Sequence, residues 1–376
     1  MAINLRSPYV VNTAISATAY ATLDISIWEG SSLSPVTAQY SLRKTASGLF
    51  LNFEISELIR DYLEISFNGS YTGQAVWVKT VHNAYDSADV NIYSNTRTES
   101  GFEGYSYFEE QGSNPDKDSL FMSNRELFVL KGNVFRVPIH TVNSPTVVFY
   151  KDGEVVAAES FIVSNESSNQ IKYVSVYGDD VNWDTFQERV TDDGSEYEPN
   201  ACLQAFFDSQ VIGTVDRITV SDVNGLESIK VNTLEECKYE PKKVTFINKF
   251  GALQDMYFFK KSVETMSVSK ESYKSNAALE YGGYDTFNHV NRDFNILGKE
   301  SISLSSGFLS EEYNEVFKQM MLSEKVWVTN VVNNKELVLP INLKTSDITY
   351  KTSLNNKLVE YTIQFDKSYD VINNIR

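Results

Sequence analysis

Apolar and polar residues alternate along several short stretches of the chain, with the period of two that places successive side chains on opposite faces of a β-strand. Residues 23–28 and 171–177 follow this pattern, and residues 359–366 follow it strictly. Residues 75–81 are a further strand candidate. In residues 359–366, one face consists of Val359, Tyr361, Ile363 and Phe365. The pattern predicts a protein built mainly from short strands.

Another pair of stretches has the sequence pattern of a β-hairpin. Residues 146–150 and 154–157 are rich in apolar and β-branched residues, and Asp152 and Gly153 lie between them. Aspartate followed by glycine tolerates the positive φ angles that a tight two-residue turn requires. A hairpin is therefore expected here.

Two stretches have the spacing of an amphipathic helix instead. The first is a short helix that begins near Ser56, which we expect to act as its N-cap. The second spans residues 310–322, where Ser310 is the expected cap and Glu311 and Glu312 lie at the positive end of the helix dipole. Its apolar stripe, expected to pack in the core, consists of Leu309, Tyr313, Val316, Phe317, Met320 and Met321.

Breaks in these patterns divide the chain into three units. We expect one β-sandwich over residues 1–98 and a second over residues 120–240, with an acidic insertion at residues 178–200. Residues 241–376 form a C-terminal β-rich unit that carries the helix over residues 310–322. Regularly spaced short strands are typical of immunoglobulin- or fibronectin-like sandwiches. The predicted fold class is therefore mainly β, with tandem sandwich domains followed by a C-terminal β-rich domain with one amphipathic helix.

Residues 99–119 have no sustained period and combine acidic, glycine and aromatic residues with Pro115. A stretch of this length is either a domain linker or an arm that binds another subunit. As an arm, it would bury aromatic side chains that are costly to leave in water. The four candidates for intersubunit contacts are Phe102, Tyr105, Tyr107 and Phe108.

Charge and hydropathy narrow the class of partner. The 376 residues carry a net charge of −17. Binding to a phosphate backbone needs clustered Lys and Arg, and no basic run occurs, so we expect no specific binding of nucleic acid. No stretch approaches the roughly 20 apolar residues of a membrane helix, so no membrane insertion is expected either.

Residues suited to catalysis or metal binding show no recognised arrangement. The three histidines, His82, His140 and His289, lack the spacing of metal ligands, and no nucleophile-elbow, phosphate-loop or dinucleotide-binding motif occurs. Cys202 and Cys237 are too few for a disulfide framework, and whether they pair stays open. We therefore expect a protein that is not an enzyme and that uses neither a metal nor a cofactor.

The C-terminal third resembles a known class of proteins in residues 246–255, 307–314 and 361–366, and in the ending at residues 372–376. The opening at residues 4–9 is also similar to the starts of such proteins. These are the virion structural proteins of tailed phages that infect Bacteroidota, including crAss-like phages.

The resemblance implies a component of the tail, neck or baseplate that works as one of many copies in a ring. It implies a location in the virion after assembly in the cytoplasm of the host bacterium. The implied partners are further copies of the chain and other virion structural proteins.

A second class of function stays open from the sequence. Tandem sandwiches with exposed aromatic residues are also typical of carbohydrate- or receptor-binding modules, such as tail fibres and adhesins. Trp183, in the acidic insertion, is the candidate for stacking on a sugar ring. Trp77 and Trp327 lie inside strand patterns, where we expect them in the core.

Overall fold

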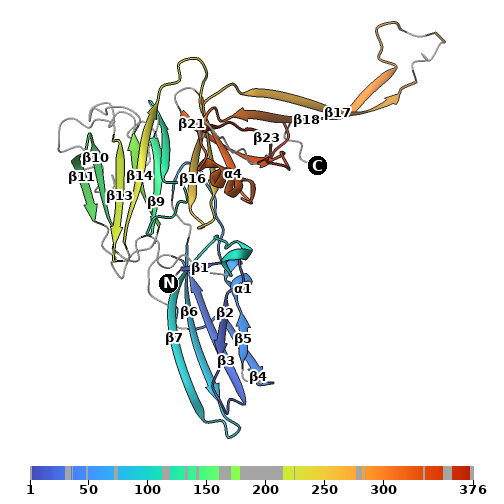
Figure 1. The fold of residues 1–376 in the computed structure, drawn as a ribbon. Coiled ribbons are helices and arrows are strands. Elements are labelled where there is room, and N and C mark those ends of the chain that lie inside the picture. The colour runs from blue at the N-terminus through green and yellow to red at the C-terminus, as the bar shows by residue number, and fades with distance from the viewer. Residues whose placement is uncertain are drawn as a thin grey trace.

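The structure is a computed structural model of the chain. It describes residues 2–29, 35, 37–47, 50–71, 75–111, 119–131, 134–140, 144–160, 171–177, 215–223, 225–276, 282–283, 285–332, 335–349 and 358–372. Strands make up most of the regular structure, and they form several sheets in three β-rich units (Figure 1). The predicted mainly β fold class is confirmed.

The N-terminal unit is a sandwich of seven strands and a short helix. Its elements are β1 (Ala2–Asn4), β2 (Val10–Thr13), β3 (Tyr20–Trp28), β4 (Tyr40–Thr45), β5 (Leu51–Glu54), α1 (Ser56–Arg60), β6 (Val76–Tyr85) and β7 (Asn91–Phe102). Five strands form a sheet in the order β1-β7-β6-β3-β4, and β2 pairs with β5. Leu23 and Val78 of the sheet pack with Phe53 and Ile59 in one buried cluster. Strand β7 continues past residue 98, where the unit was expected to end.

The helix α1 begins differently from the prediction. Ile55, and not Ser56, occupies the N-cap position. Ser56 is the first helical residue, and both its backbone N–H and its hydroxyl donate to the carboxylate of Glu54. The hydroxyl that was expected to cap the helix therefore donates to the side chain of Glu54 instead.

The second unit has strands in two facing sheets. The segment before it contains the short helix η1 (Phe108–Glu110). Its own elements are β8 (Glu126–Leu130), β9 (Val134–His140), β10 (Thr146–Lys151), β11 (Glu154–Ser160), β12 (Ile171–Tyr177), β13 (Arg217–Asp222) and β14 (Gly225–Leu234). The order in one sheet is β11-β10-β13-β14-β8, and β12 pairs with β9. The predicted hairpin is confirmed, and Asp152 and Gly153 at its turn have φ angles of +52° and +86°. The acidic insertion at residues 178–200 lies outside the described residues.

The third unit is built on a seven-stranded sheet in the order β16-β15-β20-β21-β23-β18-β17. Its elements are β15 (Lys242–Ile247), β16 (Leu253–Phe258), β17 (Val263–Lys274), β18 (Asn291–Ser305), β19 (Leu309–Ser310), α4 (Tyr313–Met321), β20 (Val326–Val332), β21 (Lys335–Leu343), β22 (Leu358–Val359) and β23 (Thr362–Lys367). The strictly alternating stretch at residues 359–366 is divided between β22 and β23. Its four apolar residues are all buried, as the alternation predicts.

The helix α4 is shorter than the range predicted for it, residues 310–322. Ser310 ends strand β19, where it pairs with Leu358, so it cannot cap the helix, and Glu312 occupies the N-cap position. The expected apolar stripe is buried at Leu309, Tyr313, Val316, Phe317 and Met320. Met321 is only half-buried.

The second and third units share one hydrophobic core. Phe135 and Val147 of the second unit belong to the same buried cluster as Phe246 and Phe365 of the third. The boundary expected at residue 240 therefore marks a change of sheet and not a break in packing. No helix among the described residues is long and apolar enough to cross a membrane.

A smaller cluster joins all three units, and we call it the junction cluster. It consists of Ala2, Ile65, Phe67, Tyr71, Phe102, Phe121, Ile171, Tyr173, Ile247, Ala252, Leu253 and Trp327. These side chains come from the N-terminal sandwich, from β12 and from the seven-stranded sheet. Their burial holds the three units in a fixed arrangement.

Candidate interaction site on a projecting hairpin

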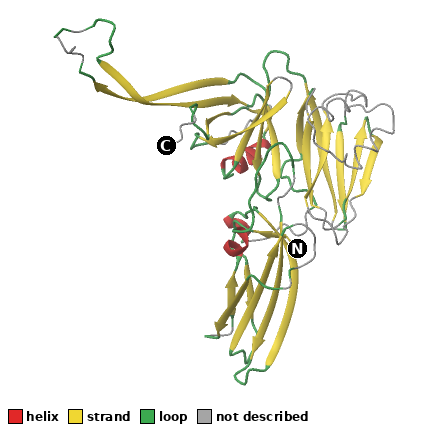
Figure 2. Ribbon diagram, turned by 180° about the vertical axis from the view of Figure 1, so that it is seen from behind, coloured by secondary structure: helices red, strands yellow, loops and turns green. Residues whose placement is uncertain are grey.

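Strands β17 and β18 form a ribbon that extends away from the rest of the molecule (Figures 1 and 2). Only residues 301–305 of β18 pair with β23. Among the described residues, no third strand pairs with residues 263–300, which we call the projecting hairpin. Since a strand rises about 3.3 Å per residue, the twelve residues of β17 span roughly 40 Å.

Apolar side chains are exposed on both faces of the projecting hairpin. The pairing places Met266 and Val268 on one face, where they are 57% and 54% exposed. Tyr273 and Phe294 lie on the other face, with their rings in an edge-to-face contact at 5.7 Å. A two-stranded ribbon is only marginally stable by itself in water. A partner that covers these side chains would stabilise it.

The C-terminal segment supports the base of the projecting hairpin. The N–H of Val371 donates to the carbonyl of Gly298 at 2.9 Å, and Lys367 forms an ion pair with Glu300. That hydrogen-bonded pair raises the pKa of Lys367. A Cβ atom on Gly298 would lie 2.8 Å from Cε of Met266 and 3.3 Å from Cβ of Val371, so the backbone there packs closely against both side chains. These contacts fix the direction in which the ribbon leaves the sheet.

A β-bulge interrupts the projecting hairpin midway. The register shifts between Ser269 and Glu271, and Asn295 has a φ angle of +52° on the opposite strand. The side-chain amide of Asn295 donates to Glu271 at 3.0 Å, and Lys270 forms an ion pair with Asp293 at 2.6 Å. A bulge of this kind bends the strand and increases its twist. Polar contacts across the two strands hold that bend in place.

The paired strands of the projecting hairpin are neutral, although the chain as a whole carries a charge of −17. Residues 263–274 and 291–300 contain four basic residues and four acidic ones. Mixed charges of both signs allow two copies to approach there without the repulsion that a net negative surface would cause. The ribbon is therefore suited to contact between molecules of the same charge.

Two of the four aromatic residues predicted to contact another subunit are buried inside the chain. Phe102 is fully buried and lies edge to face with Phe121, with ring centroids 5.4 Å apart. Tyr105 is 8% exposed, and its burial raises its pKa to about 12. The guanidinium of Arg6 lies 4.9 Å from its ring centroid. In this arrangement Phe102 and Tyr105 are not available to a second subunit, because they already pack within their own.

The other two lie at the start of the short helix η1, where Tyr107 is half-buried and occupies the N-cap position. The hydroxyl of Tyr107 donates to Glu315 of α4 at 2.6 Å. Burial and this hydrogen bond both raise the pKa of Tyr107. Phe108, next to it, is 98% exposed, and Glu110 forms an ion pair with Lys249. Of the four, Phe108 is thus the side chain most exposed to solvent.

The described part of residues 99–119 also connects the first and third units. The N–H of Tyr105 donates to the carbonyl of Lys249 at 2.8 Å, and Glu103 forms an ion pair with Arg60. Gly251 has a φ angle of +81°, and a Cβ atom there would lie 2.8 Å from the backbone nitrogen of Glu103. The segment therefore docks closely against the third unit.

A buried carboxylate lies beside the junction cluster. Asp255 is 2% exposed and accepts hydrogen bonds from the hydroxyl of Tyr71, at 2.7 and 2.8 Å, and from that of Thr245, at 2.7 Å. Burial, followed by the charge of Asp255, raises the pKa of Tyr71 well above its usual value. The phenol therefore stays protonated and donates, which is a structural role.

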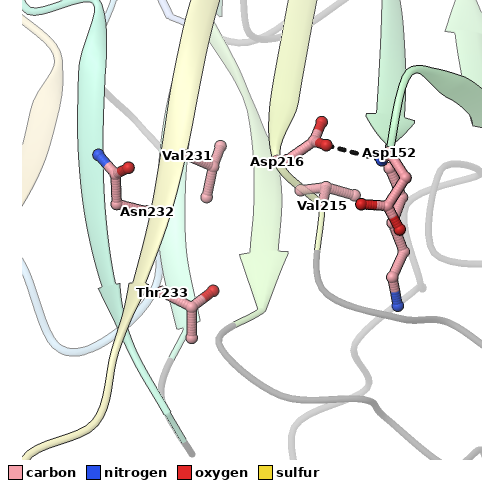
Figure 3. A pocket seen from close by; sticks show the side chains of 7 residues that line it. Asp152, Val215, Asp216, Val231, Asn232 and Thr233 are labelled. Atoms are coloured by element: carbon pink, nitrogen blue, oxygen red, sulfur yellow. Dashed lines mark hydrogen bonds between the residues drawn. The ribbon is translucent and has the colours of Figure 1, made fainter.

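A pocket of about 310 Å³ lies beside the β10–β11 turn (Figure 3). It is lined by Lys151, Asp152, Val215, Asp216, Val231, Asn232 and Thr233. The carboxylate of Asp216 accepts a hydrogen bond from the backbone N–H of Asp152 at 2.6 Å, so it serves to hold the turn. These lining residues do not place a nucleophile beside a base, and we assign the pocket no catalytic role. Within the described ranges, no three side chains converge in a way that could hold a metal ion.

The tryptophan and cysteine residues singled out from the sequence lie in different environments. Trp327 is buried in the junction cluster, as predicted. Trp77 is half-buried and stacks on Trp28 at 6.4 Å, so the prediction that it lies in the core is wrong. Trp183 lies outside the described residues. Cys237 is exposed.

The projecting hairpin was not predicted from the sequence. Its strands lack the regular alternation of a half-buried strand because both of its faces are exposed. Gly282 and Gly283, flanked by long stretches of similar length that contain no proline, are the signal that could have revealed it.

Comparisons with known proteins add little to this geometry. No protein-family model matches the chain, and no curated protein matches it. Among solved structures, it is similar to the fibronectin(III)-like modules of CbhA from Clostridium thermocellum, with 10% identity over 62% of this chain and 88% of that one. The TM-score is 0.15, so this likeness carries no argument about architecture or function.

Proposed function

We propose that this protein is a structural subunit of a tailed-phage virion, and that its copies assemble into a ring in the tail, neck or baseplate. The observation that carries the proposal is the projecting hairpin. All twelve side chains of β17 are exposed, and the ribbon has apolar residues on both faces. A ribbon of this kind is costly to maintain unless another molecule covers it.

The role proposed is geometric and not catalytic. The junction cluster fixes the three units relative to one another, so each copy presents the projecting hairpin in the same direction. A rigid subunit with one protruding contact element generates a ring when the same contact repeats around a closed axis. The likeness to virion proteins of Bacteroidota phages in the C-terminal third supports a virion as the place of this ring.

A second copy is the partner that the charges favour. The body of the molecule is strongly acidic, and a basic partner would be expected to bind an acidic surface. The exposed ribbon instead carries both signs in equal number. This balance suits a contact between identical acidic chains.

Shortening the projecting hairpin tests the proposal. Residues 267–299 are replaced by Asn-Gly, which joins Met266 to Glu300, two residues that pair directly across the ribbon. Light scattering and negative-stain imaging should show rings for the unaltered protein and single subunits for the shortened one, with the same circular dichroism per folded residue.

A matched control changes an exposed apolar residue at the far end of the N-terminal sandwich. Val90 is 55% exposed in the turn between β6 and β7, and Val90→Ser should leave assembly intact. Rings formed equally well by the shortened variant would overturn the role of the projecting hairpin. Single subunits at every concentration of the unaltered protein would overturn the proposed function.

A further inference from the structure

No described strand pairs with the outer edge of β17 at any point along its length. The strand is the last in its sheet, and among the described residues it pairs only with β18. It contains no proline. About half of its twelve residues direct backbone N–H and C=O groups away from β18, because these groups alternate in direction along a strand. Long edges with unpaired groups of this kind are templates for pairing with another chain.

A second open edge lies at the opposite end of the molecule. Strand β11 is the last in the five-stranded sheet and, where the chain is described, pairs only with β10. Val155 and Val156 on this strand are 58% and 40% exposed. Both views of the molecule place β11 and the projecting hairpin at opposite ends (Figures 1 and 2). A head-to-tail contact between copies requires two different surfaces placed in this way.

We propose that β17 of one copy pairs edge to edge with β11 of the next copy, so that the sheet of the second unit continues across the subunit boundary. This inference rests on the proposed function and specifies its contact. Main-chain hydrogen bonds supply the attraction, as in other cases where an extended strand adds to a sheet edge. The ring closes by repetition of a contact that includes this pairing.

The side chains of the two strands complement each other. Strand β11 has two glutamates and no basic residue, whereas β17 has two lysines, Lys270 and Lys274, and two glutamates, Glu264 and Glu271. An antiparallel register that places Lys274 opposite Glu154 also places Tyr273 opposite Val155. Cross-strand pairs of opposite charge, and of an aromatic with a β-branched residue, each favour pairing.

The open edge of β4 is a poorer match for β17. It carries Arg43 and Lys44 and no acidic residue. Arg43 lies 3.9 Å from the ring centroid of Tyr20, and Nζ of Lys44 donates to the carbonyl of Asn52 at 2.6 Å. Because β4 has no acidic residue, it offers Lys270 and Lys274 no opposite charge, and a register that places Arg43 or Lys44 opposite either lysine opposes pairing.

Crosslinking between single-cysteine variants tests the pairing. Cys202 and Cys237 are first replaced by serine, and each variant then receives one cysteine at an exposed strand position. The three positions are Ser269→Cys on β17, Ala158→Cys on β11 and Thr45→Cys on β4. Pairs of variants are mixed before assembly and treated with a flexible bis-maleimide, which tolerates an uncertain register.

We expect a crosslinked dimer from the mixture of S269C with A158C, and none from either variant alone or from S269C with T45C. A dimer from S269C alone would show that β17 pairs with its own copy, and would overturn the inference. A dimer with T45C would overturn it in favour of β4.

Light scattering on the same samples separates the inference from the proposed function. Rings without the S269C–A158C link would overturn the edge pairing and leave the ring proposal standing. Single subunits throughout would overturn both.

Discussion

Removing the hydroxyl of Tyr71 should destabilise the arrangement of the three units. Tyr71 reaches from the N-terminal sandwich to Asp255 of the seven-stranded sheet, and its hydroxyl lies 2.7 and 2.8 Å from the two carboxylate oxygens. In Tyr71→Phe the ring remains, and so does its contact with the guanidinium of Arg136, at 4.6 Å from the ring centroid. The change therefore isolates the hydrogen bond.

The expected loss of stability depends on which hydrogen bonds Asp255 still accepts in the variant. One hydroxyl carries one proton, so its two short contacts count as a single charge-assisted donor. Asp255 stays buried and retains the hydroxyl of Thr245 at 2.7 Å. A hydrogen bond to a charged group contributes about 1.5–3 kcal/mol, and we expect the free energy of unfolding to fall by that amount. Tyr71→Ala should cost roughly 3 kcal/mol more, because it also leaves a cavity.

Urea unfolding followed by circular dichroism measures this loss. The control is Tyr369→Phe, because Tyr369 is 40% exposed and lies outside the junction cluster. A double-mutant cycle with Asp255→Asn checks that the two groups act together. A loss below about 0.5 kcal/mol for Tyr71→Phe, the usual size of a surface substitution, would refute the account of the junction.

Three further predictions test other parts of the fold. Burial and then the charge of Arg97 lower the pKa of His82 in the folded protein, so the unfolded chain protonates this imidazole more readily. The contribution of His82 to stability is therefore complete above its unfolded pKa of about 6.5 and is lost as the pH falls below that value. His82→Gln should flatten the decrease in melting temperature on acidification, and an equal slope would contradict this. Gly251→Ala should lower the free energy of unfolding by more than about 1 kcal/mol. It should also cost more than Gly153→Ala, because Gly153 has a similar φ angle but open space around it. Equal losses in urea unfolding would show that the close approach of Gly251 to Glu103 does not matter for stability. Phe108→Ser should leave the melting temperature unchanged and weaken assembly measured by light scattering, and unchanged assembly would remove Phe108 from the interface.

Local features of the sequence predicted local structure well. The turn between β10 and β11 depends on Asp152 and Gly153 themselves, and the alternation at residues 359–366 depends on which face is buried. The stripe of α4 is likewise a property of neighbouring turns of one helix. In each case the physical cause lies within a few residues of its effect.

Features set by distant residues could not be predicted in the same way. Ser310 has the chemistry of an N-cap, but pairing with Leu358 places it in a strand. Phe102 is in a composition typical of a linker, yet it is buried because Phe121 and the rest of the junction cluster surround it. The projecting hairpin lacks a buried face, so it has no periodic pattern by which a strand is recognised.

Hydrogen exchange at the amides of the projecting hairpin tests the central claim most directly. In isolated subunits the outward amides of β17 face water and should exchange rapidly, because no described strand covers that edge. In the assembled fraction, separated by size, we expect the exchange of residues 263–274 to slow markedly, while the amides of β3 and β6 are unchanged. Equal exchange at residues 263–274 in both fractions would contradict the claim that this protein assembles through the projecting hairpin.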